Sequence, residues 1–135
     1  MNNIYLLPTC DTMCTYFIFA AIYDTAITFR LPDASLVLLR PDLGHSWDIY
    51  FEFKTTTRNA VILHSKGDTD YLKVAIIGGN QIQFQVESGS GPMGVNVRVS
   101  NKLNDNEWHS VHIEKNRWAY QIFIEFLWNV ILPML

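Results

Sequence analysis

From Trp47 onward, apolar and polar residues alternate along the chain with a period of two. The clearest segment has Ile82, Phe84 and Val86 in one phase and glutamine or glutamate in the other. Successive side chains of a β-strand point to opposite faces, so such a segment predicts a strand with one apolar and one polar face. The alternation occurs in five segments, at residues 49–54, 71–76, 81–87, 95–99 and 110–114.

Short segments of turn-forming residues separate these predicted strands. Gly78, Gly79 and Asn80 join two of them and can supply the positive φ that tight hairpins need. Further turn segments lie at residues 42–46, 55–59, 88–92 and 101–107. The middle of the chain carries no helical stripe, so the pattern predicts an all-β fold, an antiparallel β-sandwich or barrel.

Charged residues are unevenly distributed over the 135 residues. All ten lysines and arginines lie between Arg30 and Arg117, together with ten of the thirteen acidic residues. The first 29 residues carry only Asp11 and Asp24, and the last 18 carry only Glu125. A hydrophobic fraction of 49% and a net charge of −3 exclude a disordered chain and a basic nucleic-acid module.

Both apolar ends admit more than one interpretation. The run at residues 14–23 has the length of a signal peptide, but no lysine or arginine precedes it. It could be a signal or anchor, a buried strand, or a non-native leader. Glu125 and Asn129 interrupt the apolar end at residues 118–135, which favours a packed strand or helix over a membrane span. A tail outside any folded domain is the third alternative, and neither end predicts a transmembrane segment.

The two cysteines, Cys10 and Cys14, are separated by three residues. No histidine lies near them in the sequence, which argues against a zinc site. A disulfide between them requires an oxidising compartment, and two cysteines do not identify the compartment. Their pairing therefore stays open.

Several segments of the middle resemble laminin G-like domains. The most specific match is Leu103-Asn-Asp-Asn-Glu-Trp-His-Ser-Val111, which is similar to the family signature Leu-Asn-Asp-Gly-x-Trp-His-x-Val. Residues 48–56, 60–65 and 70–91 resemble the opening strand, the next strand and the central hairpin with its loop. The details look most like the domains of the neurexin IV and contactin-associated protein group.

The resemblance implies a jelly-roll, concanavalin-like antiparallel β-sandwich. It covers roughly residues 29–117, about half of a family domain, so we expect an incomplete domain there. Residues 1–28 are an unassigned apolar leader, and residues 118–135 are an unassigned apolar tail. A sandwich without its later strands exposes strand edges, so we expect the chain expressed alone to be poorly soluble or oligomeric.

The resemblance also implies a calcium ligand. Many laminin G-like domains hold one calcium ion at the rim of the sandwich, and Asp70 occupies the position of the first aspartate ligand. Asp68 could assist it, while the later ligand would fall in the missing half. The alternative is that Asp70 is a loop carboxylate that caps a turn.

The remaining polar residues give little support for a catalytic or metal site. Asp105 and Glu107 could form the carboxylate pair of a glycoside hydrolase, but their place in a predicted turn favours solvated residues. His109 and His112 are three apart on a predicted strand, so they point to opposite faces and cannot share one metal ion. The resemblance implies a structural role for the pair Trp108 and His109.

We therefore expect a non-enzymatic extracellular module of a neurexin-like adhesion protein. It would bind a cell-surface or matrix protein, or a glycan, through rim loops at residues 66–70, 88–94 and 101–107. Lys54, Lys73 and Arg98 share the polar phase of their strands and could form a weak basic patch. The alternatives are a lectin-like carbohydrate-binding domain and a truncated gene product with no independent function.

Overall fold

The computed structural model describes residues 3–6, 14–18, 26–31, 35–39, 45–125 and 127–133. These residues form twelve β-strands and no helix. The strands are β1 (Asn3–Leu6), β2 (Cys14–Ile18), β3 (Ala26–Phe29), β4 (Leu36–Leu39), β5 (Trp47–Lys54), β6 (Ala60–Lys66), β7 (Tyr71–Ile77), β8 (Gln81–Glu87), β9 (Pro92–Arg98), β10 (His109–Lys115), β11 (Ala119–Ile124) and β12 (Leu127–Pro133).

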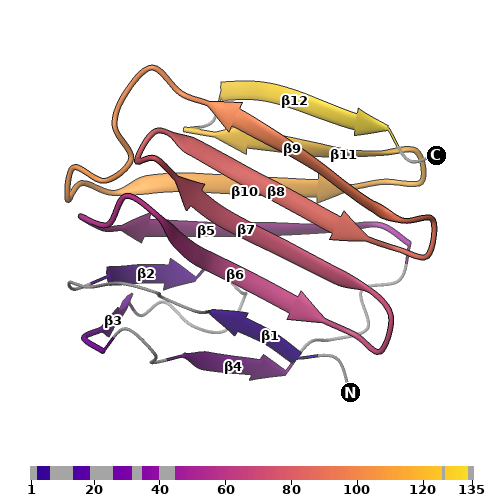
Figure 1. The fold of residues 1–135 in the computed structure, drawn as a ribbon, viewed down its shortest axis with the longest axis horizontal. Helices are drawn as coiled ribbons and strands as arrows, with labels where there is room; N and C mark the ends of the chain where they lie inside the picture. Colours follow the sequence, from indigo (N-terminus) through magenta and orange to yellow (C-terminus); the bar gives the residue numbers. More distant parts are fainter. Residues whose placement is uncertain are drawn as a thin grey trace.

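The strands form two six-stranded sheets that pack face to face (Figure 1). The first sheet has the order β4-β1-β6-β7-β8-β9, and the second has the order β12-β11-β10-β5-β2-β3. Neighbouring strands in both sheets are antiparallel. The rings of Phe84 in β8 and Tyr120 in β11 lie 5.4 Å apart between centroids, which joins the two inner faces. The predicted antiparallel β-sandwich is confirmed.

The core follows the alternation in the sequence. In β8, Ile82, Phe84 and Val86 are buried, while the glutamines between them are half-exposed. The second sheet contributes large buried side chains from three adjacent strands to the same cluster, namely Phe51, Phe53, Val111, Ile113, Tyr120, Ile122 and Ile124. Each fully buried side chain of this size stabilises the fold by about 1.5–3 kcal/mol relative to an exposed one.

The predicted strands in the middle correspond to β5, β7, β8, β9 and β10. One boundary differs, because β9 begins at Pro92 inside a segment that the sequence predicts to be a loop. Pro92 pairs with Glu87, and Gly94 pairs with Gln85. A proline is tolerated there because β9 is the edge strand of its sheet and needs no hydrogen bond on its outer side.

The apolar C-terminal end continues the second sheet. β11 pairs with β10, and β12 pairs with β11. Tyr120, Ile122 and Ile124 are buried in the common core. Residues 119–124 and 127–133 are therefore strands, one of the two packed forms expected for this end. The division of the chain at residues 28 and 117 stays a prediction.

Parts of the apolar N-terminal end also form strands. Cys14 lies in β2, which pairs with β5 in the second sheet. Cys10 lies outside the described residues. The expected alternatives for its pairing with Cys14 therefore stay open. Within the described ranges, no helix is long and apolar enough to cross a membrane.

Candidate functional site

Three loops meet at one end of the sandwich, at the left in Figure 1. They are the β5–β6 loop (residues 55–59), the β7–β8 turn (residues 78–80) and the β9–β10 loop (residues 99–108). The Gly79 N–H donates to the Arg58 carbonyl at 2.8 Å, and the Leu103 N–H donates to the Gly79 carbonyl at 2.7 Å. The Asn106 N–H donates to the Thr55 carbonyl at 3.0 Å. The three loops therefore hold one another in place.

Gly79 is at the centre of this contact. Gly78 and Gly79 have φ values of 64° and 82°, which confirms the positive φ predicted for this turn. A Cβ atom on Gly79 would lie 2.5 Å from Oδ1 of Asn104. The absence of a side chain at this position allows the β9–β10 loop to lie directly against the turn.

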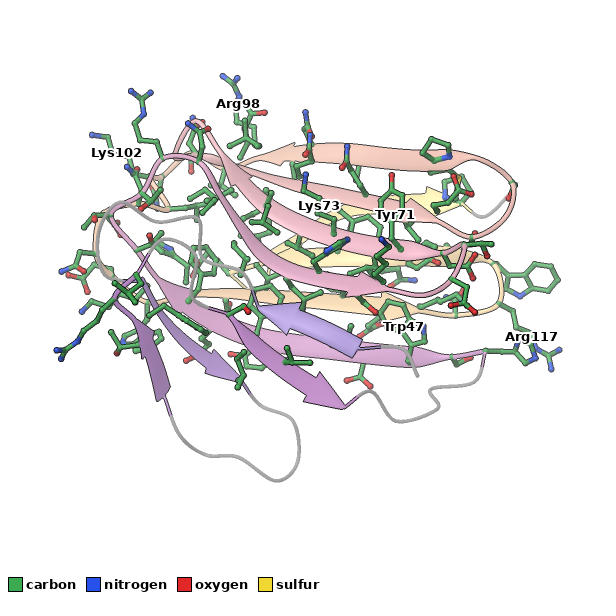
Figure 2. The ribbon with its side chains drawn as sticks, turned by 60° about the horizontal axis from the view of Figure 1, so that its bottom comes forward. Trp47, Tyr71, Lys73, Arg98, Lys102 and Arg117 are labelled. Carbon is green, nitrogen blue, oxygen red and sulfur yellow. The ribbon has the colours of Figure 1, made fainter. Side chains whose placement is uncertain are left out.

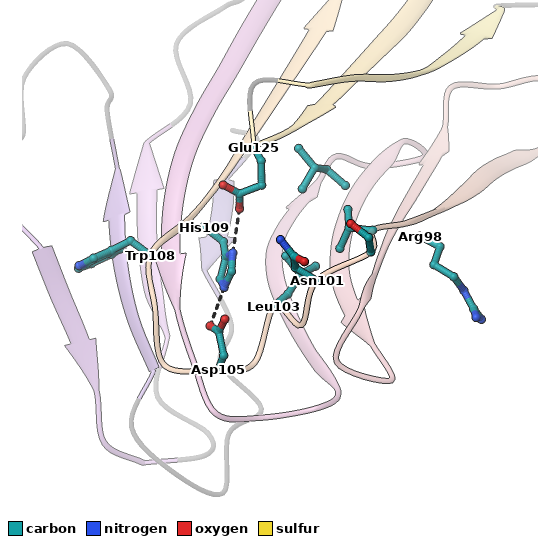
Figure 3. A pocket seen from close by; sticks show the side chains of 10 residues that line it. Arg98, Asn101, Leu103, Asp105, Trp108, His109 and Glu125 are labelled. Carbon is teal, nitrogen blue, oxygen red and sulfur yellow. Dashed lines mark hydrogen bonds and ion pairs between the residues drawn. The ribbon is translucent and has the colours of Figure 1, made fainter.

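His109 connects the β9–β10 loop to the β11–β12 turn (Figure 3). Its Nε2 lies 2.8 Å from Oδ1 of Asp105, and its Nδ1 lies 2.8 Å from Oε1 of Glu125. Ionised carboxylates only accept hydrogen bonds, so both ring nitrogens donate when the ring carries two protons. The ring itself is buried at the start of β10, and it packs on Phe53 with centroids 5.7 Å apart. Asp105, His109 and Glu125 are called the rim cluster below.

Asp105 has an electrostatic environment that keeps it ionised. The hydrogen bond from His109 lowers the pKa of its carboxyl group below the ordinary value of 3.8. The Glu107 N–H adds a second bond to the same oxygen, at 3.0 Å. A carboxyl group with a lowered pKa is a poor proton donor at neutral pH. The contacts of Asp105 thus suit a residue that organises the loop rather than a general acid.

A pocket of ≈ 560 Å³ lies beside the rim cluster and is called the rim pocket. The rim cluster forms part of the pocket wall, and Leu103 of the β9–β10 loop is a buried lining residue. Figure 3 shows the side chains of Arg98 and Trp108 pointing away from the His109 ring. The full lining is Arg98, Val99, Ser100, Asn101, Leu103, Asp105, Trp108, His109, Ile124 and Glu125.

Glu125 is the member of this site that the sequence interpretation missed. It has a φ of 56°, and its N–H donates to the Ser110 carbonyl at 3.2 Å. The signal in the sequence was that Glu125 is the only charge among the last 18 residues. A lone charge in an apolar segment indicates a paired group, but its partner on β10 becomes evident only in the folded sheet.

The predicted rim loops lie at opposite ends of the molecule. The β6–β7 turn (residues 67–70) and the β8–β9 turn (residues 88–91) lie at the right in Figure 1, across from residues 101–107. Asp70 is exposed there, its Oδ1 accepts a hydrogen bond from Thr69 Oγ1 at 3.0 Å, and its carbonyl accepts one from the Gly67 N–H at 2.7 Å.

These contacts give Asp70 a role in its own turn. The described residues contain no group of three or more acidic, histidine or cysteine side chains placed to hold a metal ion. Calcium takes about six to eight oxygen ligands, which include backbone carbonyls and waters, so calcium binding at Asp70 with Asp68 stays a prediction.

The histidines and basic residues of the strands are also separated. His112 points to the outer face of the second sheet, where it stacks on Phe123 with centroids 5.5 Å apart, whereas His109 packs on Phe53 of the core. The two histidines point to opposite faces, as their spacing predicts. Lys54 lies in the second sheet, while Lys73 and Arg98 lie in the first, so the three do not form one patch.

The fold and the rim together define an antiparallel β-sandwich domain with its candidate recognition site in loops at one end. The chain belongs to the laminin G domain family, whose model matches residues 53–129. This match confirms the resemblance drawn from the segment Leu103–Val111.

Neurexin-4 of Drosophila melanogaster is 50% identical over 104 residues, which cover 77% of this chain and 8% of that protein. The chain thus corresponds to a small part of this relative. Among solved structures, domains LG4-5 of the mouse laminin alpha1 chain align with 98% of this chain and 30% of that chain. The TM-score is 0.63 at 12% identity. The LG1-3 region of the laminin alpha2 chain aligns with 98% of this chain and 22% of that chain, with a TM-score of 0.62 at 15% identity.

Proposed function

We propose that this chain is a non-enzymatic interaction module of a neurexin-like adhesion protein outside the cell, and that its rim pocket binds a partner. The observation that carries the proposal is the rim cluster, in which one buried imidazole joins two loops through 2.8 Å bonds to both carboxylates. Loops held by a rigid sandwich present a preformed surface, which lowers the entropic cost of binding.

The partner is a protein or glycan of the cell surface or matrix. Family membership supports an adhesion-type module, because laminin G domains of neurexin-like proteins have this character. The contacts of Asp105 support binding without bond cleavage, because its carboxylate accepts hydrogen bonds from the His109 ring and from the Glu107 N–H. Activity on a glycoside substrate that Asp105→Asn abolishes would contradict this part of the proposal.

A cell-binding assay tests the rim. The chain is clustered on fluorescent beads and incubated with cultured cells, and bound beads are counted by flow cytometry. Lys102→Glu reverses an exposed charge in the β9–β10 loop, and we expect it to change binding by about tenfold. Arg117→Glu reverses an exposed charge in the turn between β10 and β11, at the opposite end of the sandwich from Lys102 (Figure 2), and is the control.

The outcomes separate the alternatives. Binding that protease treatment of the cells removes supports a protein partner, and binding that glycosidase treatment removes supports a glycan. Equal binding by wild type, Lys102→Glu and beads without protein would overturn the proposal. An equal loss in both variants would place the interaction outside the rim.

Calcium binding at Asp70 stays a prediction of the family resemblance. Titration of the chain with millimolar calcium in a calorimeter tests it directly, with Asp70→Asn as the comparison. A saturable heat that Asp70→Asn removes would support a calcium role. The absence of heat in the wild-type chain would leave Asp70 as a turn residue whose Oδ1 accepts from Thr69.

A further inference from the structure

The geometry of the rim cluster fits one protonation state of its histidine. Nε2 of His109 lies 2.8 Å from Oδ1 of Asp105, and Nδ1 lies 2.8 Å from Oε1 of Glu125. Ionised carboxylates only accept hydrogen bonds, whereas a neutral imidazole has one N–H and one lone pair. In a neutral ring, one of the two contacts would set a lone pair against a carboxylate oxygen. The complete cluster therefore requires a ring with two protons.

Burial makes these two hydrogen bonds matter. The His109 ring is buried and packs on Phe53, with centroids 5.7 Å apart. In a low-dielectric setting a hydrogen bond to a charged group is stronger than in water, and a polar atom without its bond is costly. The loss of one proton from the ring thus changes which bonds the cluster can make.

The charged groups that face His109 come from two parts of the chain. Asp105 belongs to the β9–β10 loop, and Glu125 follows β11. On β5 the register partner of His109 is Phe53, which carries no charge. Arg98 of β9 lines the same pocket, but its side chain points away from the ring (Figure 3). Among the described residues, the two carboxylates are thus the groups whose hydrogen bonds change when the ring titrates.

The two hydrogen bonds are not equivalent. Oδ1 of Asp105 also accepts from the Glu107 N–H at 3.0 Å, and Asp105 lies on the same loop as His109, four residues before it. Glu125 has a φ of 56°, a left-handed backbone conformation that is unfavourable for a residue with a side chain. Such conformations persist only where the surrounding contacts hold them. We therefore expect a neutral ring to keep its one N–H on Asp105 and to release Glu125.

The rim pocket lies between the two parts of the chain that the ring joins. Asn101, Leu103 and Asp105 line it from the β9–β10 loop, and Ile124 and Glu125 line it from the end of β11. The distance between these parts sets the shape of the pocket. Release of Glu125 would therefore change the pocket while both sheets stay in place.

We propose that the rim cluster is a proton-controlled latch of the rim pocket, an inference that rests on the proposed function of this pocket as a binding site. With two protons on His109 the latch is closed, and the pocket has the shape that binds the partner. With one proton, Glu125 separates from the ring and binding weakens. Histidine ordinarily changes its charge between about pH 5 and 8, so binding should fall as the pH rises through this range.

Hydrogen–deuterium exchange of the full 135-residue chain tests the latch without a partner. The Glu125 N–H donates to the Ser110 carbonyl at 3.2 Å, so its exchange reports on the latch. Between pH 5 and pH 9 we expect exchange in the peptide that contains Glu125 to rise about tenfold, after correction for intrinsic rates and relative to β8 as the internal reference.

Three variants identify the group that titrates. Glu125→Gln should remove the pH dependence, because an amide can accept from Nδ1–H or donate to its lone pair. His109→Gln should also remove it, because the new side chain does not titrate. His112→Gln is the matched control, since His112 stacks on Phe123 at the outer face, and it should keep the dependence. Wild-type exchange that is equal at both pH values, or a dependence that Glu125→Gln retains, would overturn the latch.

The bead assay on fixed cells then tests control of the pocket. Wild-type binding should fall about tenfold from pH 5 to pH 9, whereas Glu125→Gln, normalised to its own binding at pH 5, should stay constant. Exchange that depends on pH together with binding that does not would overturn control of the pocket by the latch. Exchange that depends on pH, with no binding at any pH, would support the latch and contradict the proposed function.

Discussion

At the scale of single residues, His109 joins parts of the chain that lie far apart in sequence. It starts β10, and its partner Glu125 follows sixteen residues later, after β11. Its second partner, Asp105, precedes it by four residues in the β9–β10 loop. The structural role expected for His109 thus has a physical basis, since one ring holds the loop and the turn at a fixed separation.

The lowered pKa of Asp105 predicts how stability depends on pH. A carboxyl group whose pKa is lower in the folded state stabilises the fold above the unfolded value of 3.8. That contribution is lost as pH falls through the folded pKa. We expect Asp105→Asn to cost about 1 kcal/mol at neutral pH, because it removes a partly exposed charged hydrogen bond.

Urea unfolding between pH 7 and pH 2.5 measures this difference in free energy. The gap between wild type and Asp105→Asn should close as the solution becomes acidic. Glu107→Gln is the control, because Glu107 contacts Asp105 through its backbone N–H, which the substitution keeps. A gap that stays constant over the whole range would contradict the prediction.

A second residue-scale prediction concerns Gly79. Gly79→Ala places a Cβ atom 2.5 Å from Oδ1 of Asn104 at a φ of 82°. Gly91→Ala has a similar φ of 99° with nothing within 4 Å, so it suffers only the backbone strain of about 1–2 kcal/mol. We expect Gly79→Ala to lower the free energy of unfolding by at least 1 kcal/mol more than Gly91→Ala.

Urea denaturation measures the free energy of unfolding of both single variants and of the double variant that combines Gly79→Ala with Asn104→Gly. The double variant should recover part of the loss, because the clashing amide is gone. Equal losses for Gly79→Ala and Gly91→Ala would show that the contact with Asn104 has no energetic consequence.

At the scale of elements, β11 determines whether the apolar end is part of the domain. Ile122 is fully buried and belongs to the common core. Ile122→Ala should lower the free energy of unfolding by about 2–5 kcal/mol through lost burial and the cavity that remains. Gln121→Ala, at the neighbouring half-exposed position, should change it by less than about 1 kcal/mol.

The same measurement tests the predicted boundary at residue 117. If Ile122→Ala leaves stability unchanged, β11 packs without contributing to stability, and the boundary at residue 117 expected from the sequence analysis stands. A large loss would extend the folded unit past Trp118. The family model already matches as far as residue 129.

At the scale of the whole molecule, each sheet of the described residues has two edge strands. In the first sheet the edges are β4 and β9, and in the second they are β12 and β3. Unpaired backbone groups on such edges favour association with another chain. We expect the isolated chain to be oligomeric, as size-exclusion chromatography with light scattering would measure. A sharp monomer peak with cooperative thermal unfolding would contradict this.

The strand alternation and the turn residues predicted much of the fold. Ile82, Phe84 and Val86 identified β8 from their period alone, and Gly78 and Gly79 identified the turn before it. β9 was the weaker case, because Pro92 and Gly94 break the alternation and only pairing with β8 makes them a strand. The local pattern predicts a strand correctly where one of its faces is apolar. It does not predict a strand whose residues become a strand only by pairing with a neighbour.

The sequence by itself determined the β-sandwich class, the family signature around Trp108 and His109, and the opposite directions of His109 and His112. Only the tertiary structure decided that Asp105 and Glu125 meet on one histidine. The physical reason is that side-chain direction follows from the local period of a strand. Which residues become neighbours depends on register and sheet order, which are set by the packing of the whole chain.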